Sequence, residues 1–98
     1  MIYVVATLKI RPGSLQTVLD AAKKVIAETN KETGCIFYDM FHSVTAPETL
    51  VFVERWESMD NLASHGKAPH MAEWRAAGAP HILDRKVEII EPANVTVR

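Results

Sequence analysis

The side chains best suited to chemistry lie between residues 54 and 70. Glu54 stands two positions before Trp56, and His65 and His70 follow. Histidine can take or give a proton near neutral pH, and a carboxylate on an apolar strand face is either paired or has a raised pKa. The chain has no Gly-rich phosphate loop, no Cys-x-x-Cys and no His-Glu-x-x-His. These residues therefore favour proton-transfer chemistry over phosphate or zinc-protease chemistry.

Both leading candidates also have an ordinary structural interpretation. His65 follows Leu62 by three positions, so the two share the side of an expected helix that faces a sheet. His65 would then be either a hydrogen-bonded core residue or a general base. Glu54 would be either an acid with a raised pKa or the partner in a salt bridge, for which the candidate cations are Arg75, Arg85 and Lys86.

The spacing of the histidines argues against a metal site. His65 and His70 are five positions apart with Pro69 between them, whereas ligand pairs on one helix are usually four apart, and no third ligand is evident. His42 and His81 fall at an expected strand end and in a turn, where surface positions are the default. We therefore expect no metal.

The hydropathy pattern predicts the elements that position these residues. Apolar residues recur with period two in strands and at i, i+3, i+4 in helices. In chain order the pattern predicts a strand at 2–10, a helix from Leu15, strands at 35–42 and 49–57, a helix from Ser58, a short helix at 70–77, a strand at 82–91 and a β-prone tail at 94–98. This β-α-β-β-α-β order is the ferredoxin-like α+β arrangement, with an antiparallel sheet and the helices on one face. Residues 1–98 form one domain.

Turn-forming and capping residues mark the helix ends. Ser14 and Ser58 are expected N-caps, because their hydroxyls can accept a free backbone N–H. Gly34 is the expected glycine just past the first helix. Pro69 suits the first position of the short helix, where its missing N–H costs nothing.

Both faces of the expected sheet carry large apolar side chains. In the third strand Leu50, Phe52, Glu54 and Trp56 alternate with Val51, Val53 and Arg55. The helices can cover only one face, and an uncovered apolar face of this size usually marks an interface. We therefore expect a homodimer whose two sheets pack face to face, with a concave site in or beside the gap.

Composition narrows the partners and the location. The formal net charge is −1, and there is no basic block of the kind that binds nucleic acid. No apolar stretch approaches the 18 residues that a membrane span needs. The single cysteine, Cys35, excludes an internal disulfide and reads as a small buried hydrophobe. We expect a cytoplasmic protein that binds neither nucleic acid nor membrane.

Taken together, several segments resemble the antibiotic biosynthesis monooxygenase family, most closely its quinol monooxygenase branch. The segments are Glu54-Arg55-Trp56-Glu57-Ser58, Leu62, His65, Pro69-His70-Met71 and Glu32-Thr33-Gly34-Cys35. The resemblance covers nearly the whole chain. It implies a dimeric ferredoxin-like α+β barrel that oxidises a quinol or polycyclic phenol with O2 in an apolar pocket, without metal, haem or flavin.

The resemblance also implies roles for particular residues. His65 would be the polar residue at the pocket rim and, with Glu54, the catalytic pair. The implied substrate-binding residues are Trp56, Phe52, Tyr38, Arg75 and His70. Phe52 departs from the asparagine that polyketide-tailoring members carry there, which argues against their hydrogen-bonded substrate pose. Thr7 stands where haem-degrading relatives have an asparagine, so haem is disfavoured.

Two other functions remain open from the sequence. One family branch isomerises phosphorylated autoinducer-2 and shares the Pro-His segment and the strand glutamate, so this chain could be an isomerase or tautomerase of a small dicarbonyl. Glu54 or His65 would then shuttle the proton. The chain could also be a non-enzymatic ligand-binding dimer, because the fold alone does not determine activity.

Overall fold

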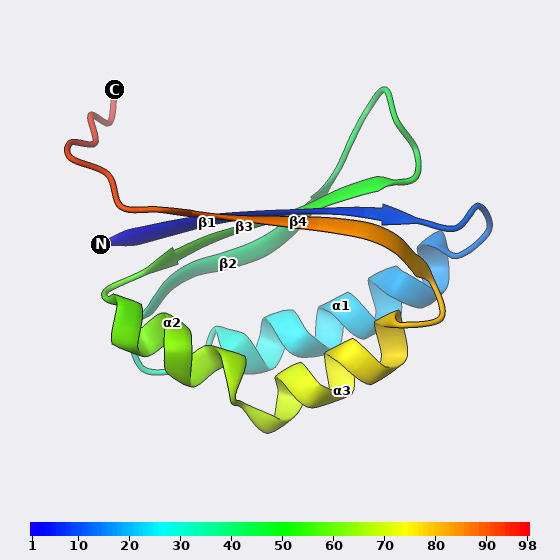
Figure 1. Cartoon of the computed structure of the whole chain (residues 1–98), viewed down its shortest axis with the longest axis horizontal. Helices are drawn as coiled ribbons and strands as arrows, with labels where there is room; N and C mark the ends of the chain where they lie inside the picture. The colour runs from blue at the N-terminus through cyan, green and yellow to red at the C-terminus, as the bar shows by residue number, and fades with distance from the viewer.

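The strands form one antiparallel sheet, and the helices pack against one of its faces (Figure 1). The computed structural model describes residues 1–98. The elements are β1 (Ile2–Ile10), α1 (Leu15–Thr29), β2 (Cys35–His42), β3 (Thr49–Trp56), α2 (Met59–Gly66), α3 (Pro69–Gly78) and β4 (Ile82–Ile90). The spatial strand order is β2-β3-β1-β4. The predicted ferredoxin-like α+β fold is confirmed, with the second helical segment divided into α2 and α3.

Strand β1 lies in the interior of the sheet, and the alternating hydropathy of its residues matches their alternating burial. Its even-numbered residues face the helices and are buried, while most of its odd-numbered residues are only partly buried. Val4 pairs with Glu54 of β3 and Ile89 of β4, and Ala6 pairs with Phe52 and Val87, so these side chains share the helix-facing side. The buried face of α1 packs on this side and completes the core through Val18, Ala22 and Val25.

The break between α2 and α3 follows from the local sequence. Ser58 caps α2 as predicted, because its hydroxyl accepts the backbone N–H of Asn61 at 3.2 Å. The helix ends at Gly66, and Pro69 starts α3 at a position where no N–H is needed. The chain turns at this break, so the last turn of α2 and the first turn of α3 both lie near the turn that follows α1.

Three local predictions differ from the structure. Helix α1 ends at Thr29, before Gly34, because Asn30 closes it by donating its side-chain amide to the carbonyl oxygens of Ile26 at 2.8 Å and Tyr38 at 3.1 Å. Ser14 is the N-cap residue of α1 as predicted, but its hydroxyl makes no capping hydrogen bond and lies 2.9 Å from Nδ1 of His81 instead. Residues 94–98 form no strand, because they leave the sheet and have no neighbouring strand to pair with.

Gly34 is required by a close approach rather than by a helix end. Its φ is +83°, and an added Cβ would collide with the side chain of Asn61 in α2. We expect Gly34→Ala to cost about 1–2 kcal/mol for the left-handed backbone and about 1–3 kcal/mol more for the collision. Urea unfolding of the purified variant measures the loss.

Gly13→Ala is the matched control for that variant. Gly13 has a φ of +85° but no atom within 4 Å of the added Cβ, so only the backbone cost applies. The Gly34 variant should therefore unfold at a clearly lower urea concentration than the Gly13 variant. Equal midpoints would mean that Asn61 moves aside freely and that the contact is unimportant.

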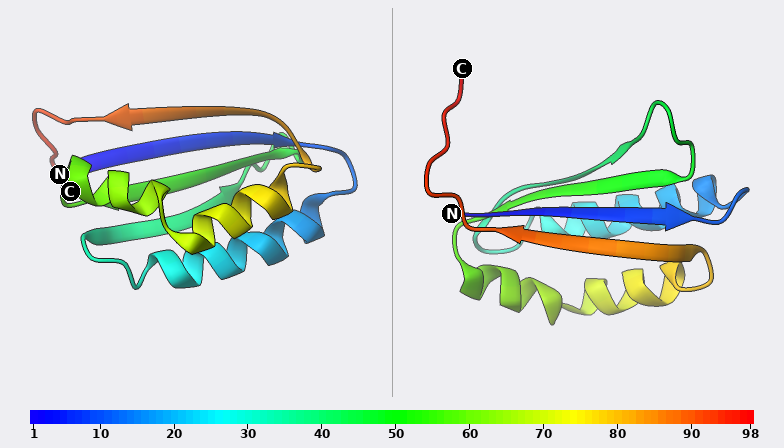
Figure 2. Two further views of the ribbon diagram at one scale, coloured as in Figure 1. Left: turned by 60° about the horizontal axis from the view of Figure 1, so that its bottom comes forward. Right: turned by 45° about the horizontal axis from the view of Figure 1, so that its top comes forward.

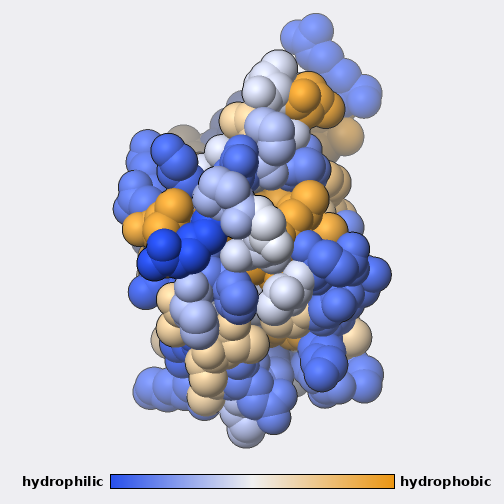
Figure 3. Space-filling model, turned by 90° about the vertical axis from the view of Figure 1, so that its right-hand side faces the viewer, coloured by the Kyte–Doolittle hydropathy of each residue, from blue (hydrophilic) through white to orange (hydrophobic).

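The sheet face opposite the helices is uncovered in the single chain (Figure 1). It carries apolar side chains on β1 to β3 and the charged pair Lys86–Glu88 on β4. Tyr3, Val5 and Val53 are half-buried there, and Phe41 is 50% exposed. The guanidinium of Arg55 lies 4.9 Å from the ring centre of Phe37 and covers part of this face. At the end of the molecule seen in Figure 3, hydrophobic residues form only small patches among hydrophilic ones. We call the broad face opposite the helices the outer sheet face.

Candidate active site

A cavity of about 280 Å³ lies between the helix-facing side of the sheet and helices α2 and α3. Of its 15 lining residues 11 are hydrophobic, including Val4, Ala6, Leu8, Leu62, Met71 and Trp74. We call it the inner cavity. No helix lies in front of β4 in the left view of Figure 2, and the lining residues Val87 and Ile89 are about half exposed. The inner cavity therefore opens beside β4, and its volume suits a small ligand.

A second hollow of about 310 Å³ runs between α1 and α3. Six of its ten lining residues are not hydrophobic, and they include Asp20, Lys24, Glu28, His70 and Glu73. Such a surface is well hydrated and offers an apolar ligand little to bury against. The inner cavity is the better candidate because it combines apolar walls with a few polar groups.

His65 is the polar group most deeply placed in the inner cavity. It sits in the last turn of α2 and is only 4% exposed, so it is a buried wall residue rather than a rim residue. Its ring centre lies 4.7 Å from that of Trp56 and 5.2 Å from that of Tyr38. Aromatic packing on two sides fixes the orientation of the imidazole.

The two ring nitrogens of His65 have different surroundings. Nδ1 lies 2.7 Å from a carboxylate oxygen of Glu32, and an ionised carboxylate can only accept, so Nδ1 carries the proton. Nε2 has no hydrogen-bond partner in the protein. Among the side-chain polar atoms that are completely buried, only Thr29 Oγ1 lacks a hydrogen-bond partner. Nε2 also lacks a partner, so it is not completely buried, and it is open to the cavity that His65 lines. A neutral His65 therefore presents its basic nitrogen to a ligand.

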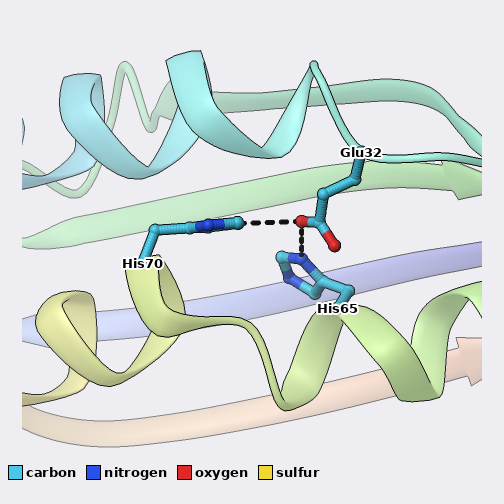
Figure 4. Close-up of side chains that lie close together, drawn as sticks. All are labelled: Glu32, His65 and His70. Carbon is cyan, nitrogen blue, oxygen red and sulfur yellow. Dashed lines mark hydrogen bonds and ion pairs between the residues drawn. The ribbon is translucent and has the colours of Figure 1, made fainter.

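Glu32 is the site residue that the sequence reasoning missed. It lies in the turn after α1, and its Oε2 accepts from both His65 and His70, the latter at 2.9 Å (Figure 4). The resemblance included Glu32 without giving it a role. The sequence showed only that His65 and His70 lacked a third polar partner. It did not indicate that this partner would be Glu32, which lies 33 positions before His65.

Glu54 lines the inner cavity and is 6% exposed. Its Oε1 accepts the indole N–H of Trp56 at 2.9 Å. Burial raises the pKa of Glu54 above its ordinary value, and the Trp56 hydrogen bond and His65 only partly oppose this. The salt-bridge alternative is wrong, because Arg75 donates to the carbonyl of Gly66 and neither basic residue of β4 is bonded to Glu54.

The structure brings most of the predicted site residues together. Phe52, Tyr38, Glu54, His65 and Arg75 all line the inner cavity. Trp56 is fully buried and lies outside the lining, where it holds Glu54. His70 also lies outside the lining, and it contacts Glu32 from α3.

Three further residues, Arg85, Tyr38 and Cys35, bear on the electrostatics in and near the site. Arg85 joins Arg75 in the lining, and neither has an acidic partner, so the cavity has positive charge beside β4. Burial and the charge of Glu54 raise the pKa of Tyr38, which therefore stays a neutral phenol. Cys35 is half-buried rather than fully buried, and burial raises its pKa to about 11, so it is an unreactive thiol.

Comparison with known proteins gives a consistent family. The sequence model described as "Antibiotic biosynthesis monooxygenase" matches residues 1–77. The Escherichia coli protein named "Probable quinol monooxygenase YgiN" is 33% identical over 103 residues, which covers 94% of this chain and 98% of that protein.

None of the three helices is long and apolar enough to cross a membrane.

Solved structures agree with the sequence relatives. The structure of Rv0793 from Mycobacterium tuberculosis has a TM-score of 0.90 at 26% identity and covers 98% of both chains. A crystal structure described as an antibiotic biosynthesis monooxygenase has a TM-score of 0.90 at 25% identity, covering 96% of this chain and all of that one.

Proposed function

Because the chain belongs to the antibiotic biosynthesis monooxygenase family, we propose that it oxidises a small quinol-like phenol with O2 in the inner cavity, without a metal or organic cofactor. The observation that carries the proposal is the state of His65. Its Nδ1 proton is held by Glu32 while its Nε2 is open to an apolar cavity. That arrangement is a positioned general base.

The first step is removal of a phenol proton by Nε2 of His65. Apolar walls exclude water, which strengthens the attraction between the new phenolate and nearby cations. Arg75 and Arg85 are the cations that line the cavity, and the imidazolium formed on His65 is itself positive. The carboxylate of Glu32 stabilises this imidazolium through the bond at 2.7 Å.

The second step needs only the electron-rich phenolate and O2. One electron passes from the phenolate to O2, and the two radicals combine into a carbon-bound peroxide anion, which takes back the proton from Nε2 of His65 and becomes a hydroperoxide. This intermediate loses water and leaves a hydroxylated quinone. The sum is one quinol plus one O2 giving one hydroxyquinone plus one water, so the substrate supplies every electron. The protein contributes deprotonation, orientation and a dry site.

The proposal is tested by O2 uptake with a reduced naphthoquinone in the presence of a chelator. We expect uptake above the uncatalysed rate and, under 18O2, one labelled oxygen in the quinone product. Conversion to the plain quinone alone, or a rate equal to that without protein, would contradict the proposal. The labelled product also separates an oxygenase from an isomerase, which consumes no O2.

We also propose that two chains pair through the outer sheet face. The support is the uncovered apolar part of this face on β1 to β3, where Val53 lies opposite Val5 in the register. We expect a dimer by sedimentation at micromolar concentration, and we expect Val53→Lys to be monomeric because it places a charge in the contact. Ala27→Lys on the exposed side of α1 is the control and should stay dimeric. A monomeric native protein would contradict this proposal.

A further inference from the structure

We propose that Glu32, His65 and His70 form a binding site for a divalent transition-metal ion of the zinc class. We further propose that the ion, when bound, inhibits the enzyme by engaging His65. The three residues, which we call the Glu-His-His cluster, come from the turn after α1, the end of α2 and the start of α3. Figure 4 shows both imidazoles directed at one carboxylate.

The geometry of the Glu-His-His cluster is close to that of a metal site. Its three ligand atoms lie within 4.8 Å of one another. Nδ1 of His65 and Nε2 of His70 lie 2.7 and 2.9 Å from the same oxygen of Glu32. Ligand atoms about 2.0–2.1 Å from a tetrahedral zinc are roughly 3.3 Å apart. Each nitrogen would therefore move about half an ångström away from the Glu32 oxygen, and the distance between the two nitrogens, which is within 4.8 Å, would settle at about the same 3.3 Å.

The donor set and its charge also fit. Two imidazoles and one carboxylate, with a fourth position open, are a usual zinc set, and imidazole suits the later transition metals generally. All three side chains are at most 17% exposed. Glu32 has no lysine or arginine partner, so only imidazole hydrogens oppose its charge. A bound cation would neutralise this partly buried carboxylate.

The position of the cluster indicates inhibition rather than metal-based oxygen chemistry. Of the three residues only His65 lines the inner cavity, so an ion would sit behind the imidazole and away from the substrate. An ion on Nδ1 displaces the proton that Glu32 now holds there. The neutral ring then carries its proton on Nε2, the nitrogen that faces the cavity, and can no longer act as a base. This consequence rests on the proposed function, whereas the binding does not.

Isothermal titration of the metal-free protein with ZnCl2 tests the binding. We expect one ion per chain, and we expect Co2+ to give visible absorption bands typical of a low-coordinate nitrogen and oxygen site. His70→Gln and Glu32→Gln each remove one ligand and should weaken zinc binding by at least about 100-fold. His42→Gln removes an exposed histidine elsewhere and should bind zinc as the native protein does.

The outcomes separate the two parts of the proposal. Equal zinc affinity in the native protein and in His70→Gln, or no stoichiometric binding, would overturn the site and would show that the cluster is only a hydrogen-bonded trio. Zinc binding that leaves quinol-dependent O2 uptake unchanged would overturn the inhibition alone. A protein without oxygenase activity would contradict the proposed function, yet its calorimetric and Co2+ measurements would still test the metal site.

Discussion

Replacing His65 by alanine is expected to lower kcat/KM for quinol-dependent O2 uptake by about 100- to 10,000-fold, the usual contribution of a positioned general base. The physical reason is that Nε2 of His65 is the unoccupied basic nitrogen in the apolar cavity, while Nδ1 is committed to Glu32. The remaining polar lining groups are two arginines, a neutral tyrosine and Glu54. Oxygen-electrode rates with a reduced naphthoquinone, corrected for autoxidation, measure the loss.

Two further variants separate the loss of the base from general damage. Glu32→Gln keeps the shape of the partner but can offer its amide N–H to Nδ1, which would move the proton to Nε2. We therefore expect a loss in the same direction but smaller than that of His65→Ala. His42→Ala removes an exposed histidine and should retain the native rate. Circular dichroism confirms folding in each case.

The interpretation of His65 as a base fails if His65→Ala turns over as fast as the native protein while folded. It also fails if adding imidazole to His65→Ala restores no activity although the emptied space can admit it. In either result the inner cavity would bind and orient the substrate, but removal of the phenol proton would not depend on His65.

The fold could be predicted because local pattern and tertiary packing agree in nearly every element. The alternating hydropathy of β1 corresponds to alternating burial in the structure, because helices cover one face of the sheet. Ser58 and Pro69 set the starts of α2 and α3 through purely local chemistry. The end of α1 was misplaced because Asn30 reaches the carbonyl of Tyr38 in β2, a contact that depends on how helix and sheet pack.

The candidate site could be predicted only where single elements position its residues. Glu54, Phe52 and Trp56 share a strand face, and His65 shares a helix face with Leu62, so their side of the sheet follows from the spacing. The contact of Glu32 with both histidines depends on the bend between α2 and α3. Likewise the spacing places Trp56 beside Glu54 but does not show that the indole N–H points at the carboxylate.

We expect Trp56→Phe to lower the free energy of unfolding by about 2.5–5 kcal/mol at pH 8. The substitution removes the only protein hydrogen bond to the buried carboxylate of Glu54, and a bond to a charged group is worth about 1.5–3 kcal/mol. The smaller ring adds a packing loss of about 1–2 kcal/mol at a fully buried position. Urea unfolding at pH 8 measures the sum.

The loss should depend on pH in a defined direction. The folded-state pKa of Glu54 is raised above its unfolded value, so this residue costs stability as pH rises through the two values. Removing the Trp56 bond raises the folded pKa further, which widens the cost at higher pH. Below about pH 4 the carboxyl is largely protonated in both states, so Trp56→Phe should cost only the packing loss and a weaker neutral hydrogen bond of about 0.5–1.5 kcal/mol.

Glu54→Gln isolates the carboxylate from the packing. Glutamine can still accept the indole N–H but carries no charge, so this variant should be more stable than the native protein at pH 8 and no more stable near pH 4. In the Glu54→Gln background, Trp56→Phe should cost the same at both pH values. A cost that still grew with pH in this background would show that another group titrates. It would also show that the indole of Trp56 does not stabilise the ionised form of Glu54 in the wall of the inner cavity.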